Sequence, residues 1–175
     1  MLAAGQALGH GFGCNFCFPQ QIEPAESPTG TIFLVHGHDS SAKNEVALML
    51  KRGGLEVTIL HQQPNGGRTI LEKFEGHAGA AAFAIVLLTP DDIGGPIGGT
   101  MMPRARQNVV GEMFWFAGKL GRTKVCALRK GDVEMPSDFL GMVYTDMDDR
   151  GAWKHELLRE LQAAGYVVDW QRALA

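Results

Sequence analysis

The chain has 175 residues, a formal net charge of −3 and 45% hydrophobic residues, which suits one globular domain with a proper core. Its basic pairs, Arg104/Arg106 and Arg129–Lys130, are too sparse to predict nucleic-acid binding, and its longest apolar run, 78–88, is too short to span a membrane. Three cysteines do not make a disulfide framework, and the first residues lack the pattern of a signal peptide. We therefore expect a cytoplasmic protein that contacts neither nucleic acid nor membrane.

Residues 1–30 are rich in Gly, Pro and Gln and show no clear period, which predicts a linker or a poorly ordered extension. The segment contains Cys14-Asn-Phe-Cys17, preceded by His10. A structural zinc site usually has about four ligands, and the sequence has no second cysteine pair. We interpret Cys14 and Cys17 as reduced thiols in a tail and expect no metal.

Residues 31–175 are predicted to form one domain of alternating strands and helices. Strands are expected over 31–35, 55–60, 83–88, 124–128 and 141–145, and residues 166–170 can extend the sheet at its edge. Helices are expected over 42–51, about 69–77, 104–120 and 153–163, the first capped by Ser40 or Ser41. Residues 89–99 read as a long Gly/Pro loop.

This alternation of strands and helices predicts an α/β fold with a five-stranded parallel sheet and helices on both faces. The flavodoxin-like strand order 2-1-3-4-5 is the most economical arrangement, and its switch point lies between the first and third strands. The loops 36–41 and 89–99 meet there, and the loop 64–69 borders the same crevice. A small ligand is expected at this place.

Glu112 is the one charged residue between Val109 and Gly118. The surrounding helix is apolar on most sides, so we expect it to be buried nearly all round. A carboxylate in such a place must be paired, neutralised or exposed to a cavity, and a structural pairing with Arg68, Arg104 or backbone amides is the alternative to chemistry. Asn108 lies one turn earlier on the same side, and Arg104 extends the row by another turn.

The loops offer further polar groups. His36-Gly37-His38-Asp39 has too few ligands for a metal site, whereas Gly37 and the following helix N-terminus could approach a phosphate. Asn65–Thr69 offers backbone amides and Arg68, or it is a plain surface turn. Asp91 and Asp92 could serve as acid and base, or could cap a turn. No Gly-x-Ser-x-Gly motif is present, and Cys126 in a strand has no neighbouring base, so a Ser or Cys nucleophile is poorly supported.

Four blocks carry a family resemblance. They are Thr31-Ile-Phe-Leu-Val-His-Gly-His-Asp39, the segment 60–74 with its Gln-Gln-Pro-Asn-Gly-Gly-Arg-Thr, the segment 86–92, and Arg104-Ala-Arg-Gln-Asn-Val-Val-Gly-Glu112. In this order they resemble the TIR-like domain family of bacterial predicted nucleotide-binding proteins, effectors of cyclic-nucleotide-triggered antiphage systems. The resemblance covers about residues 31–170 and implies a flavodoxin-like TIR fold.

The family resemblance also implies an activity, the cleavage of NAD⁺ to nicotinamide and ADP-ribose or a cyclic variant. NAD⁺ would be the substrate, and no cofactor is expected. Glu112 matches the family's catalytic glutamate, and the loops 36–39 and 65–69 match its nucleotide-contacting loops. With the neighbouring polar groups, the expected substrate-binding residues are His36, Gly37, His38, Asp39, Arg68, Thr69, Thr89, Arg104 and Asn108.

Family effectors associate through TIR–TIR contacts and usually carry a sensor domain for a cyclic nucleotide or a partner. Here only residues 1–30 and a short tail after Trp170 remain outside the domain. We therefore expect either an excised domain or a trigger on another protein. Two other functions stay open: a non-catalytic TIR interaction or nucleotide-binding module, and an enzyme like the nucleoside deoxyribosyltransferases with Glu112 as nucleophile.

Overall fold

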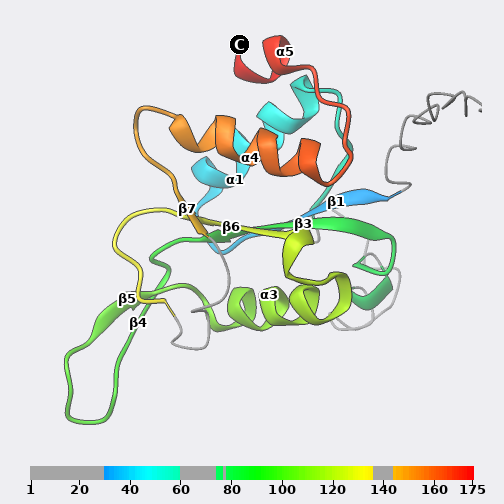
Figure 1. Cartoon of the computed structure of the whole chain (residues 1–175). Helices are drawn as coiled ribbons and strands as arrows, with labels where there is room; N and C mark the ends of the chain where they lie inside the picture. Colours follow the sequence, from blue (N-terminus) through cyan, green and yellow to red (C-terminus); the bar gives the residue numbers. More distant parts are fainter. Residues whose placement is uncertain (1–29, 60–73, 77, 136–143) are drawn as a thin grey trace, which may run out of the picture.

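The computed structural model describes residues 30–59, 74–76, 78–135 and 144–175 and places one sheet between two helical layers (Figure 1). The sheet has five parallel strands in the order β2-β1-β3-β6-β7. This arrangement confirms the predicted order 2-1-3-4-5. The strands are β1 (Thr31–Val35), β2 (Val57–Thr58), β3 (Ala81–Leu88), β6 (Val125–Arg129) and β7 (Tyr144–Asp146).

Alternating side chains of the central strands divide the core into two clusters. Leu34 of β1 is in register with Ile85 of β3, and Ile85 with Cys126 of β6; all three belong to one cluster. Their neighbours along each strand, such as Val35 and Val86, belong to the other. Because both faces of the sheet are covered, these strands are almost continuously apolar in sequence.

Helices cover both faces of the sheet, as predicted (Figure 1). On one side lie α1 (Ser40–Arg52), α4 (Ala152–Ala163) and the short α5 (Trp170–Leu174). On the other lies α3 (Gln107–Leu120), followed by the 3-10 turn η2 (Arg122–Lys124). None of the described helices is long and apolar enough to cross a membrane.

The α3 helix differs from its prediction in two ways. It begins at Gln107, so Arg104 is not on the helix. It also buries only one face, through Val109, Met113 and Phe116, while Phe114 remains 45% exposed. The expectation of burial nearly all round is therefore wrong. A helix on a flat sheet covers only a stripe of its surface, and the apolar residues outside that stripe stay partly exposed.

The first helix is capped by Asp39, not by Ser40 or Ser41. Asp39 Oδ1 accepts a hydrogen bond from the Ala42 amide at 2.9 Å, and the helix begins at Ser40, two residues earlier than predicted. Aspartate is a strong N-cap, so the acidic residue takes this position ahead of the two serines.

A two-stranded antiparallel hairpin begins in the predicted Gly/Pro loop 89–99 and ends beyond it. It is formed by β4 (Asp92–Gly94) and β5 (Met102–Arg104), and it projects away from the main sheet (Figure 1). Residues 166–170 do not extend the sheet. The side chain of Asp169 caps α5 by accepting from the Arg172 amide at 3.1 Å, and Val168 packs into the core.

Several predicted features lie outside the described residues. Of the predicted helix over 69–77, residues 74–76 are described and helical, and the helix includes residue 78 beyond the predicted end. The extension 1–29 with Cys14 and Cys17, the loop 61–69 with Arg68 and Thr69, and the first part of the fifth predicted strand fall outside.

Candidate functional site

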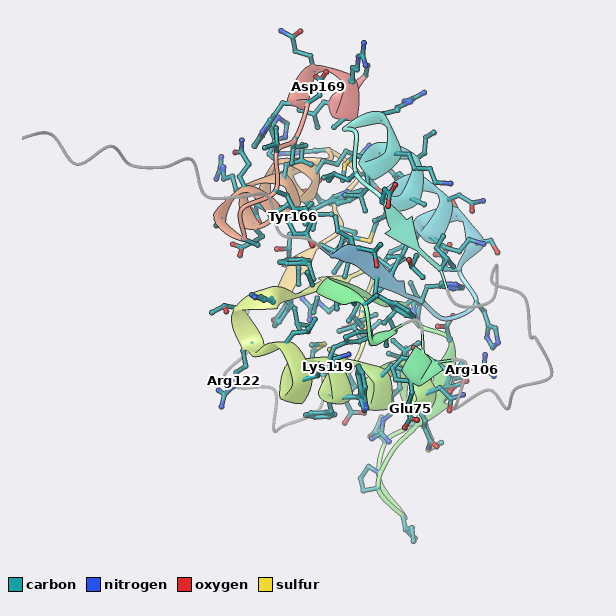
Figure 2. All side chains as sticks on the ribbon, turned by 90° about the vertical axis from the view of Figure 1, so that its right-hand side faces the viewer. Glu75, Arg106, Lys119, Arg122, Tyr166 and Asp169 are labelled. Atoms are coloured by element: carbon teal, nitrogen blue, oxygen red, sulfur yellow. The ribbon has the colours of Figure 1, made fainter. Side chains whose placement is uncertain are left out.

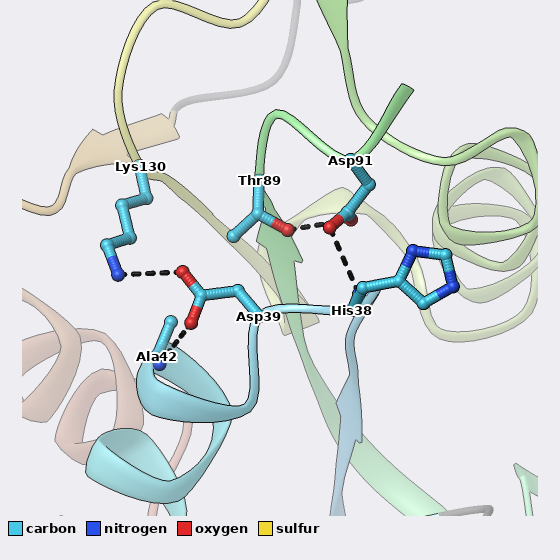
Figure 3. A network of polar contacts seen from close by, with 6 residues as sticks. All are labelled: His38, Asp39, Ala42, Thr89, Asp91 and Lys130. Carbon is cyan, nitrogen blue, oxygen red and sulfur yellow. Dashed lines mark hydrogen bonds and ion pairs between the residues drawn. The ribbon is translucent and has the colours of Figure 1, made fainter.

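The loops that follow β1 and β3 are joined by the carboxylate of Asp91 (Figure 3). The His38 amide donates to Asp91 Oδ1 at 3.1 Å, and the Thr89 hydroxyl donates to Oδ2 at 2.8 Å. Gly37 allows this approach, because a β-carbon on it would lie 1.7 Å from Asp91 Oδ2. The two loops at the switch point therefore meet, as the strand order predicts.

A second carboxylate, that of Asp39, joins a third loop to this edge (Figure 3). Its Oδ2 accepts from Lys130 Nζ at 2.7 Å, and its Oδ1 caps α1. The hydrogen bond from Lys130 is the main cause that lowers the pKa of Asp39. Sequence reasoning missed Lys130, although its position directly after β6 places it at the same edge as the other loops.

These contacts change the interpretation of the first loop as a phosphate site. The amides of His38 and Ala42 already donate to carboxylates, and Gly37 faces Asp91 rather than an open space. Thr89 is only 1% exposed and uses its hydroxyl inside the network. Asp39 and Thr89 thus have structural partners, and contacts of His36, Gly37, His38, Asp39 and Thr89 with a substrate stay a prediction.

Arg106 links α3 to the first loop. The guanidinium Nη1 donates to His38 Nε2 at 3.0 Å. Because a guanidinium only donates, His38 Nε2 is the acceptor of this hydrogen bond. Arg106 occupies the N-cap position of α3 and lies at the opposite end of the α3 layer from Arg122 (Figure 2). Sequence reasoning chose Arg104 in its place.

Glu112 lies in the second turn of α3 and is half-buried. Burial raises the pKa of its carboxyl to about 7, and the charge of Arg106 opposes that rise. Within the described residues, neither a hydrogen bond nor an ion pair to the Glu112 carboxyl is present. Asn108, one turn earlier, is exposed. A carboxyl whose pKa lies near neutral pH, on a helix that begins beside the switch-point loops, is suited to chemistry.

Arg104 forms an ion pair with Glu134 and not with Glu112. It lies on β5, and its Nε donates to Glu134 Oε2 at 2.5 Å. The two residues line a cavity of about 690 Å³ between the hairpin and the start of α3, which Glu112 does not line. The structural pairing of Glu112 with Arg104 is therefore excluded. The hydrogen bond from Arg104 lowers the pKa of Glu134, whereas burial raises that of Glu112.

The described residues offer neither a reactive cysteine nor a metal site. Burial raises the pKa of the Cys126 thiol to about 12, which makes it a poor nucleophile. Among the residues that the structure describes, no group of three or more His, Cys, Asp or Glu side chains could hold a metal ion.

Comparison with known proteins agrees with this architecture. Residues 31–149 match the model of the CAP12/Pycsar effector protein TIR domain. The chain is 53% identical over 145 residues to "Uncharacterized protein YuaY" of Escherichia coli (strain K12), covering 82% of this chain and 48% of that protein. It is 33% identical over 126 residues to "Protein tirC" of Dictyostelium discoideum, covering 65% of this chain and 62% of that protein.

The chain therefore spans about half of the first relative and less than two thirds of the second. The family match includes the loops after β1 and β3 and the whole of α3 with Glu112. The chain belongs to the family of CAP12/Pycsar effector TIR domains.

Proposed function

We propose that the protein is an NAD⁺ nucleosidase that depletes NAD⁺ as an antiphage effector, with Glu112 as the catalytic residue. The observation that carries the proposal is the half-buried Glu112 carboxyl, with its pKa near 7, on the helix that begins beside the switch-point loops. The membership of the chain in an effector TIR family supports the same conclusion.

The reaction requires little acid catalysis, because nicotinamide leaves as a neutral molecule. The bond between the nicotinamide nitrogen and ribose C1′ breaks, and its electron pair neutralises the positive ring. Positive charge then develops on the ribose, and the ionised Glu112 carboxylate would stabilise it and hold the ribose hydroxyls. Water adds to C1′ and releases a proton, which gives ADP-ribose; attack by the adenine would give a cyclic product instead.

The half-buried position of Glu112 makes this stabilisation effective. A carboxylate in a partly dry environment interacts more strongly with a nearby cation than one in bulk water. The same burial keeps part of the Glu112 population protonated at neutral pH, and that form cannot stabilise the cation. The neutral-pH enzyme would therefore be only partly in its active ionisation state.

Contacts with the rest of the dinucleotide belong to the same proposal. His36, His38 and Asn108 would contact the nucleotide from the β1 loop and α3, and Arg68 and Thr69 would hold the diphosphate. The first relative is about twice the length of the matched segment, so a sensor for a cyclic nucleotide or another signal would belong to the larger protein or to a partner. Activation would proceed through self-association of TIR domains.

The test is incubation of the protein with NAD⁺ at low and high protein concentration and with a crowding agent, alongside a mass measurement of the oligomer. We expect nicotinamide release together with ADP-ribose or its cyclic form. A separate incubation with a deoxynucleoside and a free base tests the alternative that the protein is a deoxyribosyltransferase. Absence of nicotinamide release from the assembled protein would leave only the non-catalytic module or the transferase.

Glu112→Gln should abolish release while the protein stays folded. Glu156→Gln is the matched control, because Glu156 is an exposed glutamate on α4, on the opposite side of the sheet. It should retain full turnover. Turnover by Glu112→Gln equal to that of the control would remove Glu112 from the reaction.

A further inference from the structure

We propose that the hairpin of β4 and β5 is an arm that joins two copies of this chain: Ile97 at its tip enters the cavity beside the base of the hairpin in the other copy. The inference deepens the proposed function and rests on it in one respect, because it names the contact through which the domains would associate to become active.

The arm exposes much apolar surface. It projects beyond the α3 layer in both views of the molecule (Figure 1, Figure 2). Of the large hydrophobic side chains in the described residues, three of the four most exposed lie on the arm: Ile97 is fully exposed, Ile93 is 73% exposed and Met101 is 58% exposed. Residues 94–103 carry no charged side chain. An apolar surface of this kind, projecting into solvent, marks a site of interaction with another protein surface.

The tip is a tight turn that presents Ile97 to solvent. The Gly99 amide donates to the Pro96 carbonyl at 2.9 Å, which closes a four-residue turn with Ile97 and Gly98 at its centre. Gly98 has a φ of 76°, a conformation that glycine adopts without strain. A β-carbon on Gly99 would lie 2.6 Å from Pro96 Cγ, so the turn is also closely packed. The backbone that carries Ile97 is thus fixed before binding, which reduces the conformational entropy that a complex would lose.

A cavity of suitable size and character lies beside the base of the hairpin. Its volume is about 690 Å³, and pockets of roughly 300–1,000 Å³ hold small ligands, so a turn led by one isoleucine has room to enter. Among the polar groups that line it, Arg104 and Glu134 form an ion pair with each other. The apolar part of the lining comes from Ile93, Ala105, Val110 and Met135.

The tip cannot enter the cavity of its own chain. The pairing of Asp92 with Arg104 and of Gly94 with Met102 keeps the hairpin extended. Five residues of extended chain from Asp92 to Ile97 span roughly 16 Å, so the tip and the cavity lie at opposite ends of the hairpin. Only the cavity of another molecule is within reach of the tip.

A second copy of this chain is the partner that already carries the matching cavity. Because each copy has both a tip and a cavity, the contact can form twice about a two-fold axis and close a dimer. Each copy has a formal net charge of −3, and like charges across an interface oppose association. The uncharged tip meets the cavity without placing like charges opposite each other.

The first experiment measures the mass of the full chain in solution by sedimentation equilibrium over a range of protein concentrations. We expect dimers whose fraction grows with concentration. Ile97→Asp should raise the dissociation constant by about tenfold or more, because its carboxylate would have to leave water. A protein that stays monomeric at every concentration, or an Ile97→Asp variant that associates like the unmodified chain, overturns the inference.

Val167→Asp is the matched control for Ile97→Asp. Val167 is also a highly exposed apolar residue, at 79%, but it lies between α4 and α5, on the opposite side of the sheet from the hairpin. Its substitution should leave the dissociation constant unchanged. An equal loss of association in both variants would show a general effect of added negative charge and would overturn the contact.

The second experiment tests the cavity. Gln107 lines it and is exposed in the first turn of α3, so substitutions there should leave the fold intact. Gln107→Trp fills the cavity and should weaken association as Ile97→Asp does, whereas Gln107→Ala leaves the cavity open and should not. Equal association of the two Gln107 variants would mean that the cavity serves another occupant, such as a small molecule, and would overturn the contact.

Mixing two variants tests whether tip and cavity meet each other. Ile97→Asp keeps an intact cavity and Gln107→Trp keeps an intact tip, so one contact can form between the two variants. A 1:1 mixture should therefore associate more tightly than either variant alone. A mixture that associates no better than its components would overturn the pairing of tip with cavity.

These measurements need no NAD⁺, so their outcome is independent of the proposed activity. Copies that associate through the arm but release no nicotinamide refute the proposed function and leave the contact confirmed. In a protein that does cleave NAD⁺, Ile97→Asp should release less nicotinamide per chain than Val167→Asp at a concentration where the latter is dimeric. Equal release by the two variants would overturn the link between this contact and activation.

Discussion

Asp91 occupies the space that a side chain at position 37 would fill, since a β-carbon on Gly37 would lie 1.7 Å from Asp91 Oδ2. The same carboxylate accepts the His38 amide and the Thr89 hydroxyl. Glycine at this position is therefore required by the close approach of two loops and not by an unusual backbone conformation, since its φ is outside the positive region.

Gly37→Ala should separate the two loops. The methyl group would displace Asp91 and break one or both of its hydrogen bonds, so the free energy of unfolding should fall by about 1–3 kcal/mol. Gly118→Ala is the matched control, because Gly118 is an exposed helical glycine whose added β-carbon meets nothing within 4 Å. It should raise the free energy of unfolding by about 0.5–1 kcal/mol. Urea unfolding of both variants measures the difference, and equal stabilities would contradict the steric explanation.

Asp39 has two roles that two substitutions can separate. Asp39→Asn keeps the cap of α1 and removes the ion pair with Lys130, so it should lower the free energy of unfolding by less than about 1 kcal/mol. Asp39→Ala removes both the cap and the ion pair, and should lower the free energy of unfolding by about 1 kcal/mol more. Asp169→Ala, which removes the cap of the five-residue α5, should cost less than Asp39→Ala. Thermal unfolding of the three variants checks this order.

The Asp39 pair also has a pH dependence. The pKa of Asp39 is lower in the folded protein, so its contribution to stability is present above the ordinary pKa of an aspartate and is lost as the pH falls through the folded value. Between neutral pH and about pH 3, the difference in unfolding free energy between the unmodified protein and Asp39→Asn should therefore shrink. A difference that grows on acidification would contradict the ion pair.

The central strands β1, β3 and β6 were predictable because they are buried on both faces of the sheet. Such strands appear in sequence as continuous apolar runs, and Thr31–Val35 matches its prediction residue for residue. The hairpin of β4 and β5 was not predictable from its sequence. Its strands have three residues each, lie among glycines and prolines, and lack an alternating pattern.

The residues of the site likewise differ in whether a short stretch of sequence is enough to identify them. Glu112 could be predicted because a lone carboxylate in an apolar helix is visible in a short window. Arg106 could not be chosen over Arg104, because the choice depends on where α3 begins and on two distant partners. Glu134 binds Arg104 from 30 positions away, and His38 binds Arg106 from 68 positions away.

Arg104→Gln tests whether the hairpin arginine has any part in the site. The Arg104–Glu134 pair is exposed on both sides, so its loss should leave the free energy of unfolding nearly unchanged. KM for NAD⁺ should remain within about twofold, since the guanidinium is already bound. Steady-state kinetics provide the measurement. A rise of KM by tenfold or more would return Arg104 to the substrate-binding residues predicted from sequence.

The rate of NAD⁺ cleavage should follow the ionisation of Glu112. The carboxylate is the form that stabilises the ribosyl cation, and its pKa is about 7, so kcat/KM should rise with pH and level off above about pH 8. Below the midpoint, the rate should fall about tenfold for each pH unit. Initial rates between pH 5 and 9 give the profile, and a rate that is constant from pH 5 to 8 would exclude Glu112 as the titrating group.

Glu112 should also make the fold more stable in acid than in base over a defined window. Its pKa is about 7 in the folded protein and 4.5 as its ordinary value, so the folded state binds more protons than the unfolded state between these two values. The free energy of unfolding must then decrease as the pH rises from about 4.5 to about 7. Glu112→Gln lacks this titration. As the pH rises across the window, its free energy of unfolding should therefore increase relative to that of the unmodified protein by roughly 1–3 kcal/mol. Urea unfolding of both proteins at pH 5 and pH 8 measures the gain, with Glu156→Gln as the control that should show none. If Glu112→Gln were as stable relative to the unmodified protein at pH 5 as at pH 8, the Glu112 carboxyl would have an ordinary pKa, and burial would not be tuning it for chemistry.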